Sequence, residues 1–275
     1  MSNLRKDAFK SPFYHVAIIV LLALGLVSLP VDFLFGLFIN DSTTAKLLGG
    51  IILRVILAVL AVIAIKKYGF ERPFFTNNGV KSFILIIPAL IVVVNNFPFS
   101  AVISGNAEFT ASTGQTVLYI CYCLSVGVFE ELVYCGLVFP LVLYVFRHKK
   151  YSVVFATVIS AAIFGASHLL NIFGGASVGA TIMQVGYSFL IGAMCCIAKC
   201  VTRNLFTAII LHSIYDVGGL LLSEVGIAHG SQWDTFTVII TAVLGVIVAI
   251  YMAILAFKVD HDEVEELYFS EIEHK

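Results

Sequence analysis

Long apolar segments separated by short polar ones are the main pattern of this chain. A transmembrane helix needs about 20 mainly apolar residues. Eight segments meet that need, and we predict spans at roughly 14–38, 46–65, 82–104, 115–146, 151–170, 179–201, 205–222 and 235–257. No linker rich in proline, glycine or serine divides the chain. The pattern predicts an all-α polytopic membrane protein with about eight transmembrane helices in a single domain over residues 1–275.

Composition supports a membrane protein and excludes other classes. Of the residues, 60% are apolar and 12% are charged, with a mean hydropathy of +1.02. Soluble domains carry about 25% charged residues, so this chain has too few to cover a globule in water. The lipid bilayer is therefore the expected partner of most of the surface. A net charge of -1 without a basic recognition stripe predicts no binding to nucleic acid.

Basic residues fall on one side of the predicted spans. Of the 16 Lys and Arg residues, all but Lys46 and Arg54 lie in the segments that this layout places on the same side as the two termini. Cytoplasmic loops attract such an excess. We therefore expect an integral cell-membrane protein with both termini in the cytoplasm. The acidic C-terminal tail, 258–275, is expected to be a solvated segment.

Ionisable residues inside the spans are the strongest functional signal. Such groups are costly in lipid and usually face a cavity or a partner. The five that matter most are Glu130, Glu131, His168, His212 and Asp216.

Glu130 and Glu131 lie deep within the fourth span. Neighbouring helix residues diverge by about 100°, so one should face a cavity and the other a neighbouring helix. A carboxylate in a cavity is suited to general-base work on water. The alternative is a buried hydrogen-bonding pair that fixes helix packing.

His212 and Asp216 are spaced i, i+4 and share a helical face. The carboxylate can fix the tautomer of the imidazole, leaving its second nitrogen for a water, an oxyanion or a metal. His168, near the end of the fifth span, could equally be an interfacial residue. Together these side chains could activate water or hold a divalent metal such as zinc through His168, His212 and Glu130, although the HExxH spacing is missing. The six cysteines have neither zinc nor disulfide spacing and are expected to be packing residues.

Three short motifs at these residues resemble the CPBP family, which comprises CAAX prenyl endopeptidases and bacteriocin-processing or immunity (Abi) proteins. Glu130 to Cys135 matches EExxxR except for Cys135, Phe164 to His168 matches FxxxH, and His212 to Asp216 matches HxxxN with aspartate for asparagine. The similarity covers roughly 115–222.

The resemblance implies a role for each residue. Glu130 would activate water, and His168 would assist the water or the oxyanion. His212 and Asp216 would stabilise the oxyanion or hold a metal, and Glu131 would be mainly structural. Because Cys135 replaces the arginine that would pair with Glu131, Glu131 needs another partner, such as Arg54, or must be protonated. We hypothesise that Arg54 pairs with Glu131 or Asp32, the alternative being that it snorkels to the outer interface.

The sequence is compatible with three functions. The first is an intramembrane endopeptidase that cleaves a peptide or lipidated peptide. The second is a non-proteolytic member that acts in bacteriocin immunity or regulates a partner. The third is a proton-coupled transporter. We further expect Glu130, His168, His212 and Asp216 to converge on one cavity that opens on the side of the basic loops.

Overall fold

A central helical segment, Thr113–Phe146, organises the bundle in this computed structural model, which describes residues 18–27, 31–72, 78–230 and 233–273. It consists of α7 (Thr113–Val133), the π-helical turn η2 (Tyr134–Val138) and α8 (Phe139–Phe146). Ser112 and Gln115 form a capping box at its start. Because 83% of its apolar window is buried inside the protein, the other helices pack around it.

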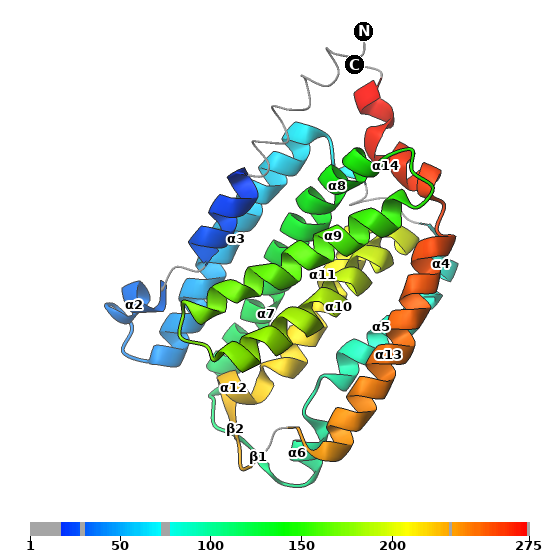
Figure 1. The fold of residues 1–275 in the computed structure, drawn as a ribbon. Helices are drawn as coiled ribbons and strands as arrows, with labels where there is room; N and C mark the ends of the chain where they lie inside the picture. Colours follow the sequence, from blue (N-terminus) through cyan, green and yellow to red (C-terminus); the bar gives the residue numbers. More distant parts are fainter. Residues whose placement is uncertain (1–17, 28–30, 73–77, 231–232, 274–275) are drawn as a thin grey trace.

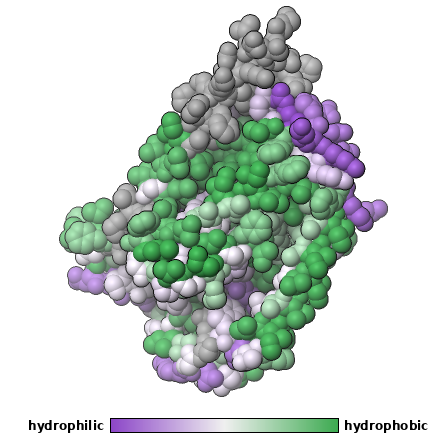
Figure 2. Space-filling view, in the orientation of Figure 1, coloured by the Kyte–Doolittle hydropathy of each residue, from purple (hydrophilic) through white to green (hydrophobic). Residues whose placement is uncertain are grey.

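Four more helices are long and apolar enough to cross a membrane. They are α3 (Ser42–Tyr68), α9 with its 3-10 extension η3 (Ser152–Ser167 and His168–Ile172), α10 (Val178–Thr202) and α13 (Thr235–Lys258). Only 11% of the apolar window of α13 is buried in the protein, so most of this helix is left for lipid. Figure 2 shows hydrophobic side chains over the flanks of the molecule and hydrophilic ones gathered over the C-terminal helix. The chain is therefore a mostly helical integral membrane protein.

The remaining apolar helices are shorter than the predicted spans. Within the first predicted segment lie a helix at Ile18–Val27 and α2 (Val31–Gly36). The third divides into α4 (Val80–Ile84), α5 (Ile87–Asn95) and α6 (Phe99–Ile103), because Pro88 starts α5 and Pro98 precedes α6. The seventh is α11 (Leu205–Gly219). The structure thus holds five helices of spanning length among the described residues, alongside these shorter ones.

A small β-ribbon modifies the all-α expectation. Strand β1 (Ala107–Phe109) pairs antiparallel with β2 (Gly226–Ala228), with Ala107 opposite Ala228. The short helix α12 (Leu221–Val225) leads into β2. The ribbon lies in the connections at one end of the bundle, away from the C-terminal helix (Figure 1). Its residues fell between predicted spans, where hydrophobic periodicity carries no signal for so short a ladder.

The acidic tail is a docked helix, so the expectation of a solvated segment is wrong. Helix α14 (His261–Glu273) buries Val264, Tyr268 and Phe269. Its acidic face is also engaged, because Glu263 pairs with Arg203 and the Glu265 carboxylate accepts from the backbone N–H of His148. The apolar residues recur at i, i+4 and i+5, which is an amphipathic helix pattern that the charge count had obscured.

Gly127 sets the close approach of α7 to α11, and replacing it should destabilise the protein. A Cβ at this position would lie 2.3 Å from Ser213 Oγ and 3.1 Å from the Ile209 carbonyl oxygen. We expect Gly127→Ala to lower the free energy of unfolding by about 1–3 kcal/mol, because an overpacked interface must move apart. Thermal unfolding in detergent would measure this. Gly245→Ala, on α13 with nothing within 4 Å of its Cβ, is the matched control; equal effects of the two changes would contradict the prediction.

Candidate active site

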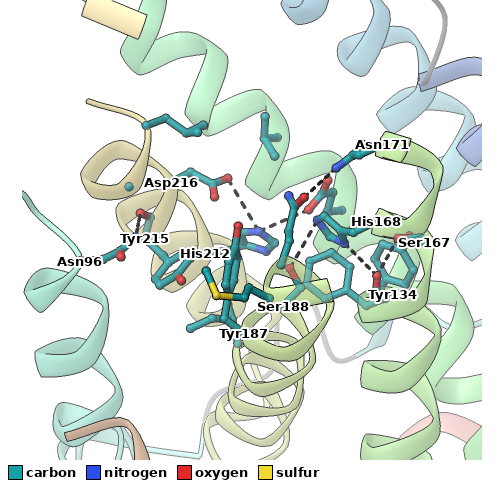
Figure 3. A pocket seen from close by; sticks show the side chains of 18 of the residues that line it. Asn96, Tyr134, Ser167, His168, Asn171, Tyr187, Ser188, His212, Tyr215 and Asp216 are labelled. Atoms are coloured by element: carbon teal, nitrogen blue, oxygen red, sulfur yellow. Dashed lines mark hydrogen bonds and ion pairs between the residues drawn. The ribbon is translucent and has the colours of Figure 1, made fainter. Parts of the chain in front are cut away.

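A cavity of about 1200 Å³ lies among α7, α9, α10, α11 and α13. Glu130, His168, His212 and Asp216 all line it, from three different helices. Figure 3 shows the two histidines and Asp216 directed into the same space. The tertiary structure thus brings these four side chains together as the sequence led us to expect, while their catalytic roles stay predictions.

His212 is the centre of the polar cluster. Its Nδ1 lies 2.6 Å from Glu131 Oε1, and its Nε2 lies 3.3 Å from Glu130 Oε2 and 3.7 Å from Asp216 Oδ2. Each ring nitrogen therefore faces a carboxylate, and a doubly protonated ring can donate on both sides. The i, i+4 spacing on α11 brings Asp216 to the same side of the ring as Glu130.

Glu131 is not part of the cavity wall. It is 2% exposed, and its carboxylate hydrogen-bonds to His212 Nδ1, the ring nitrogen that does not face Glu130. Glu131 is therefore placed to orient the imidazole. The 100° step between neighbouring residues of α7 separates it from Glu130, as the helix geometry required. Its second oxygen, Oε2, has no hydrogen-bond partner among the described residues.

Cys135 occupies the position at which the motif would have an arginine, and its surroundings differ from the expectation. Cys135 lies in the π-helical turn, is 1% exposed, and its Sγ lies 2.7 Å from Cys196 Sγ. The Nζ of Lys199, from α10, donates to the Cys135 carbonyl oxygen at 2.9 Å and lies 3.5 Å from the centroid of the Phe139 ring. Lys199 was assigned to a basic loop from the sequence, but it is buried inside α10. All six cysteines are free.

Arg54 does not pair with Glu131, so that part of the hypothesis is wrong. Its guanidinium donates to the Gly50 carbonyl and to Tyr122 Oη, and lies 4.7 Å from the centroid of the Tyr122 ring. It lines the cavity instead of reaching an outer interface. The side chain of Asp32, the other partner considered, lies outside the described residues. His212 is the partner that replaces the arginine, a role hidden in the sequence because residues 131 and 212 meet only in the fold.

Phe164 and its neighbours position His168. The Phe164 ring lies 5.0 Å from the His168 ring and 5.6 Å from the His212 ring, so it separates the two imidazoles. His168 Nδ1 lies 3.1 Å from the Phe164 carbonyl oxygen, which can only accept. The proton therefore sits on Nδ1, and Nε2 is left as an acceptor, 3.4 Å from Ser188 Oγ.

Several polar residues of the cavity carried little signal in the sequence. Asn171 donates to Gln184, and Tyr134 Oη donates to Ser167. Ser188 Oγ lies 3.4 Å from His168 Nε2. Serine and tyrosine are common in apolar helices, so spacing alone could not single them out. Asn96 also lines the cavity and donates to the Tyr215 carbonyl oxygen.

The ligand atoms of His168, His212 and Glu130, the residues expected to hold a metal, do not form one compact group. Among the described residues, Glu131, Cys195 and His212 are the group of three whose ligand atoms lie within 4.8 Å of one another, and neither Glu130 nor His168 is in it. Two ligands of a tetrahedral zinc, each at about 2.0–2.1 Å, lie roughly 3.3 Å apart. The 2.6 Å between Glu131 and His212 is a hydrogen bond and is too short for that arrangement. Glu131 and His212 would therefore have to move apart to bind one zinc ion together, whereas His212 Nε2 and Glu130 Oε2 lie 3.3 Å apart.

The cavity occupies the half of the bundle away from the basic loops. On α9, α11 and α13 the lining residues lie in the half farther from the flanking basic residues, and on α10 all but Ile191 do. Asn171 of η3 and the following Phe173 and Gly174 also line the cavity. Figure 1 shows α14 at the other end. The expectation that the cavity opens beside the basic loops is wrong. Packing is the reason, because Phe139, Lys199 and Tyr268 are buried between His212 and that end.

Comparison with protein families identifies the region that carries the site. Residues 112–218 match the family model "Type II CAAX prenyl endopeptidase Rce1-like". This range contains the three motifs, which confirms the resemblance drawn from them. The comparison with curated proteins gave no match, and neither did the comparison with solved structures. Residues 112–218 of this integral membrane protein, which hold Glu130, His168, His212 and Asp216, are therefore similar to the Rce1-like family of type II CAAX prenyl endopeptidases.

Proposed function

We propose that the protein hydrolyses a peptide bond of a peptide or lipidated-peptide substrate within the membrane. The observation that carries this proposal is the position of Glu130. Its carboxylate faces the cavity, 20% of the side chain is exposed, and it lies within 3.3 Å of His212. A carboxylate with access to water and a fixed neighbour has the geometry of a general base.

The reaction can be written with this chain's own residues. Glu130 takes a proton from a water molecule, and the water oxygen attacks the carbonyl carbon of the substrate. His212, held by Glu131 and flanked by Asp216, donates from Nε2 to the developing oxyanion. The unprotonated Nε2 of His168 helps to hold the water. When the C–N bond breaks, Glu130 returns the proton to the leaving nitrogen, and the enzyme is restored.

A cleavage assay with the purified full-length protein tests the proposal. We expect peptides, with or without a thioether-linked prenyl group, to yield fragments detectable by mass spectrometry. His168→Ala should lower the rate by about 10²-fold, as for loss of a group that positions the attacking water. His229→Ala, which removes an exposed histidine paired with Glu108, is the matched control. Fragments that persist unchanged in His168→Ala, or a complete lack of fragments from all peptides, would contradict the proposal.

The same assay tests whether cleavage depends on a metal. Since the ligand atoms of Glu130, His168 and His212 do not all lie within 4.8 Å of one another, we expect cleavage to be retained after treatment with a chelator and dialysis. Loss of cleavage on chelation, restored by added zinc, would show that the side chains rearrange around a metal.

A further inference from the structure

The depth of the cavity relative to the charged ends of the bundle bears on where the substrate comes from. Basic residues flank one end, at Lys66 and Lys67 in the last turn of α3, at Arg147 to Lys150 between α8 and α9, and at Lys258 at the end of α13. At the opposite end, the described residues include only Lys46 as a lysine or arginine, and it is bound to Glu224 at 2.6 Å. By the positive-inside rule, the first end is cytoplasmic.

The cavity reaches the second end and not the first. Its lining includes Asn171 in η3, Phe173 and Gly174 directly after η3, and Trp233, which precedes α13. Gly174 is exposed. Arg54 contributes from the middle of α3, and Glu130 from the middle of the segment Thr113–Phe146. The space therefore runs from mid-depth towards the end that holds the β-ribbon.

The cytoplasmic end is closed by packed side chains. Phe139 and Tyr268 are at most 3% exposed, and Lys199 is packed against both rings. Helix α14 adds a further layer there through Val264 and Phe269. A peptide would have to displace this core to reach Glu130 from that side, whereas no comparable layer separates Glu130 from Gly174, since both line one cavity.

Resting on the proposed peptidase activity, we infer that the site takes its substrate from the extracytoplasmic side. The substrate class is then a peptide segment exposed on the outer face of the membrane, such as part of an exported or membrane-anchored polypeptide. The C-terminus of a cytoplasmic substrate would instead approach the closed end of the helix bundle.

Cysteine labelling of the full chain in sealed right-side-out spheroplasts tests the direction. The background is Cys121→Ala, because Cys121 is exposed and the other five cysteines are buried. We expect Gly174→Cys to react with a membrane-impermeant maleimide in sealed spheroplasts. Lys149→Cys, in the basic connection, should react only after permeabilisation. The reverse pattern would overturn the inference.

A second experiment separates the direction of access from the chemistry. A reporter with one transmembrane anchor carries a cleavable peptide on its outer side, and a matched reporter carries the same peptide on its cytoplasmic side. We expect only the outer reporter to be cut, and neither with Glu130→Gln. Cutting of the cytoplasmic reporter alone would overturn the inference. If Gly174→Cys labels from outside and neither reporter is cut with any peptide tested, the peptidase proposal fails while the outward cavity is upheld.

Discussion

Replacing Glu130 with glutamine is expected to lower the rate of peptide cleavage by about 10²–10⁴-fold, the range found for loss of a general base. Glutamine has the same shape and can still hydrogen-bond to His212, but it cannot take a proton from water. The carboxylate lies at the cavity wall and not in the core, so the fold should persist. Initial rates on a substrate peptide, together with the thermal midpoint in detergent, would measure both effects.

A matched substitution outside the cavity tests whether the loss of any carboxylate lowers the rate of cleavage. Glu224 is bound to Lys46 in the connection before β2 and does not line the cavity. Glu224→Gln should therefore leave the rate of cleavage within about twofold of the parent, as expected for a surface ion pair of small energy. A Glu130→Gln variant that keeps a rate close to the parent would show that another group activates the water.

Replacing Glu131 with leucine should unfold much of the protein. The change leaves the Nδ1 of His212 buried without its acceptor, and breaking a buried pair by removing one partner costs about 3–5 kcal/mol. That loss is a large part of the stability of an ordinary domain, about 5–15 kcal/mol. We expect a large fall in the thermal midpoint and no measurable cleavage, because the imidazole is no longer held towards Glu130.

Two companion variants distinguish this pair from a general packing defect. Glu131→Gln keeps an oxygen that can accept from His212 and should lose much less stability than leucine. The double change Glu131→Leu with His212→Phe replaces both partners with apolar groups, which can be nearly neutral for stability. We expect it to be inactive yet more stable than Glu131→Leu alone. If Glu131→Leu proves as stable as the parent protein, the pair contributes nothing and Glu131 is a neutral acid.

The pair also explains how this chain accommodates Cys135. In the motif that it resembles, an arginine would neutralise Glu131 from one helical turn away. Here the neutralising group comes from α11, and the site around Cys135 is filled by Cys196 and by Lys199, which bonds to the Cys135 carbonyl. Because Cys135 is buried against Cys196, a larger arginine side chain there would have to displace its neighbours.

Hydrophobic patterning by itself determined the class of this protein. Long apolar segments can only be satisfied by lipid, so the membrane, the helical fold and the approximate helix positions follow from composition and period. The cost of burying ionisable groups then singled out Glu130, His168, His212 and Asp216, since lipid offers them no partner. The sequence determined the lengths of the helices less well, because Pro88 and Pro98 divide one predicted span into short helices.

Only the tertiary structure decided which of these groups meet and from which side they are reached. The partner of Glu131 is 81 residues away, and contacts between distant residues leave no trace in local spacing. The same holds for the burial of Lys199 and the docking of α14, which depend on how helices pack and not on their own charge. The direction of the cavity depends on which end of the bundle is filled by Phe139 and Tyr268, and hydropathy along one chain cannot report the packing between helices.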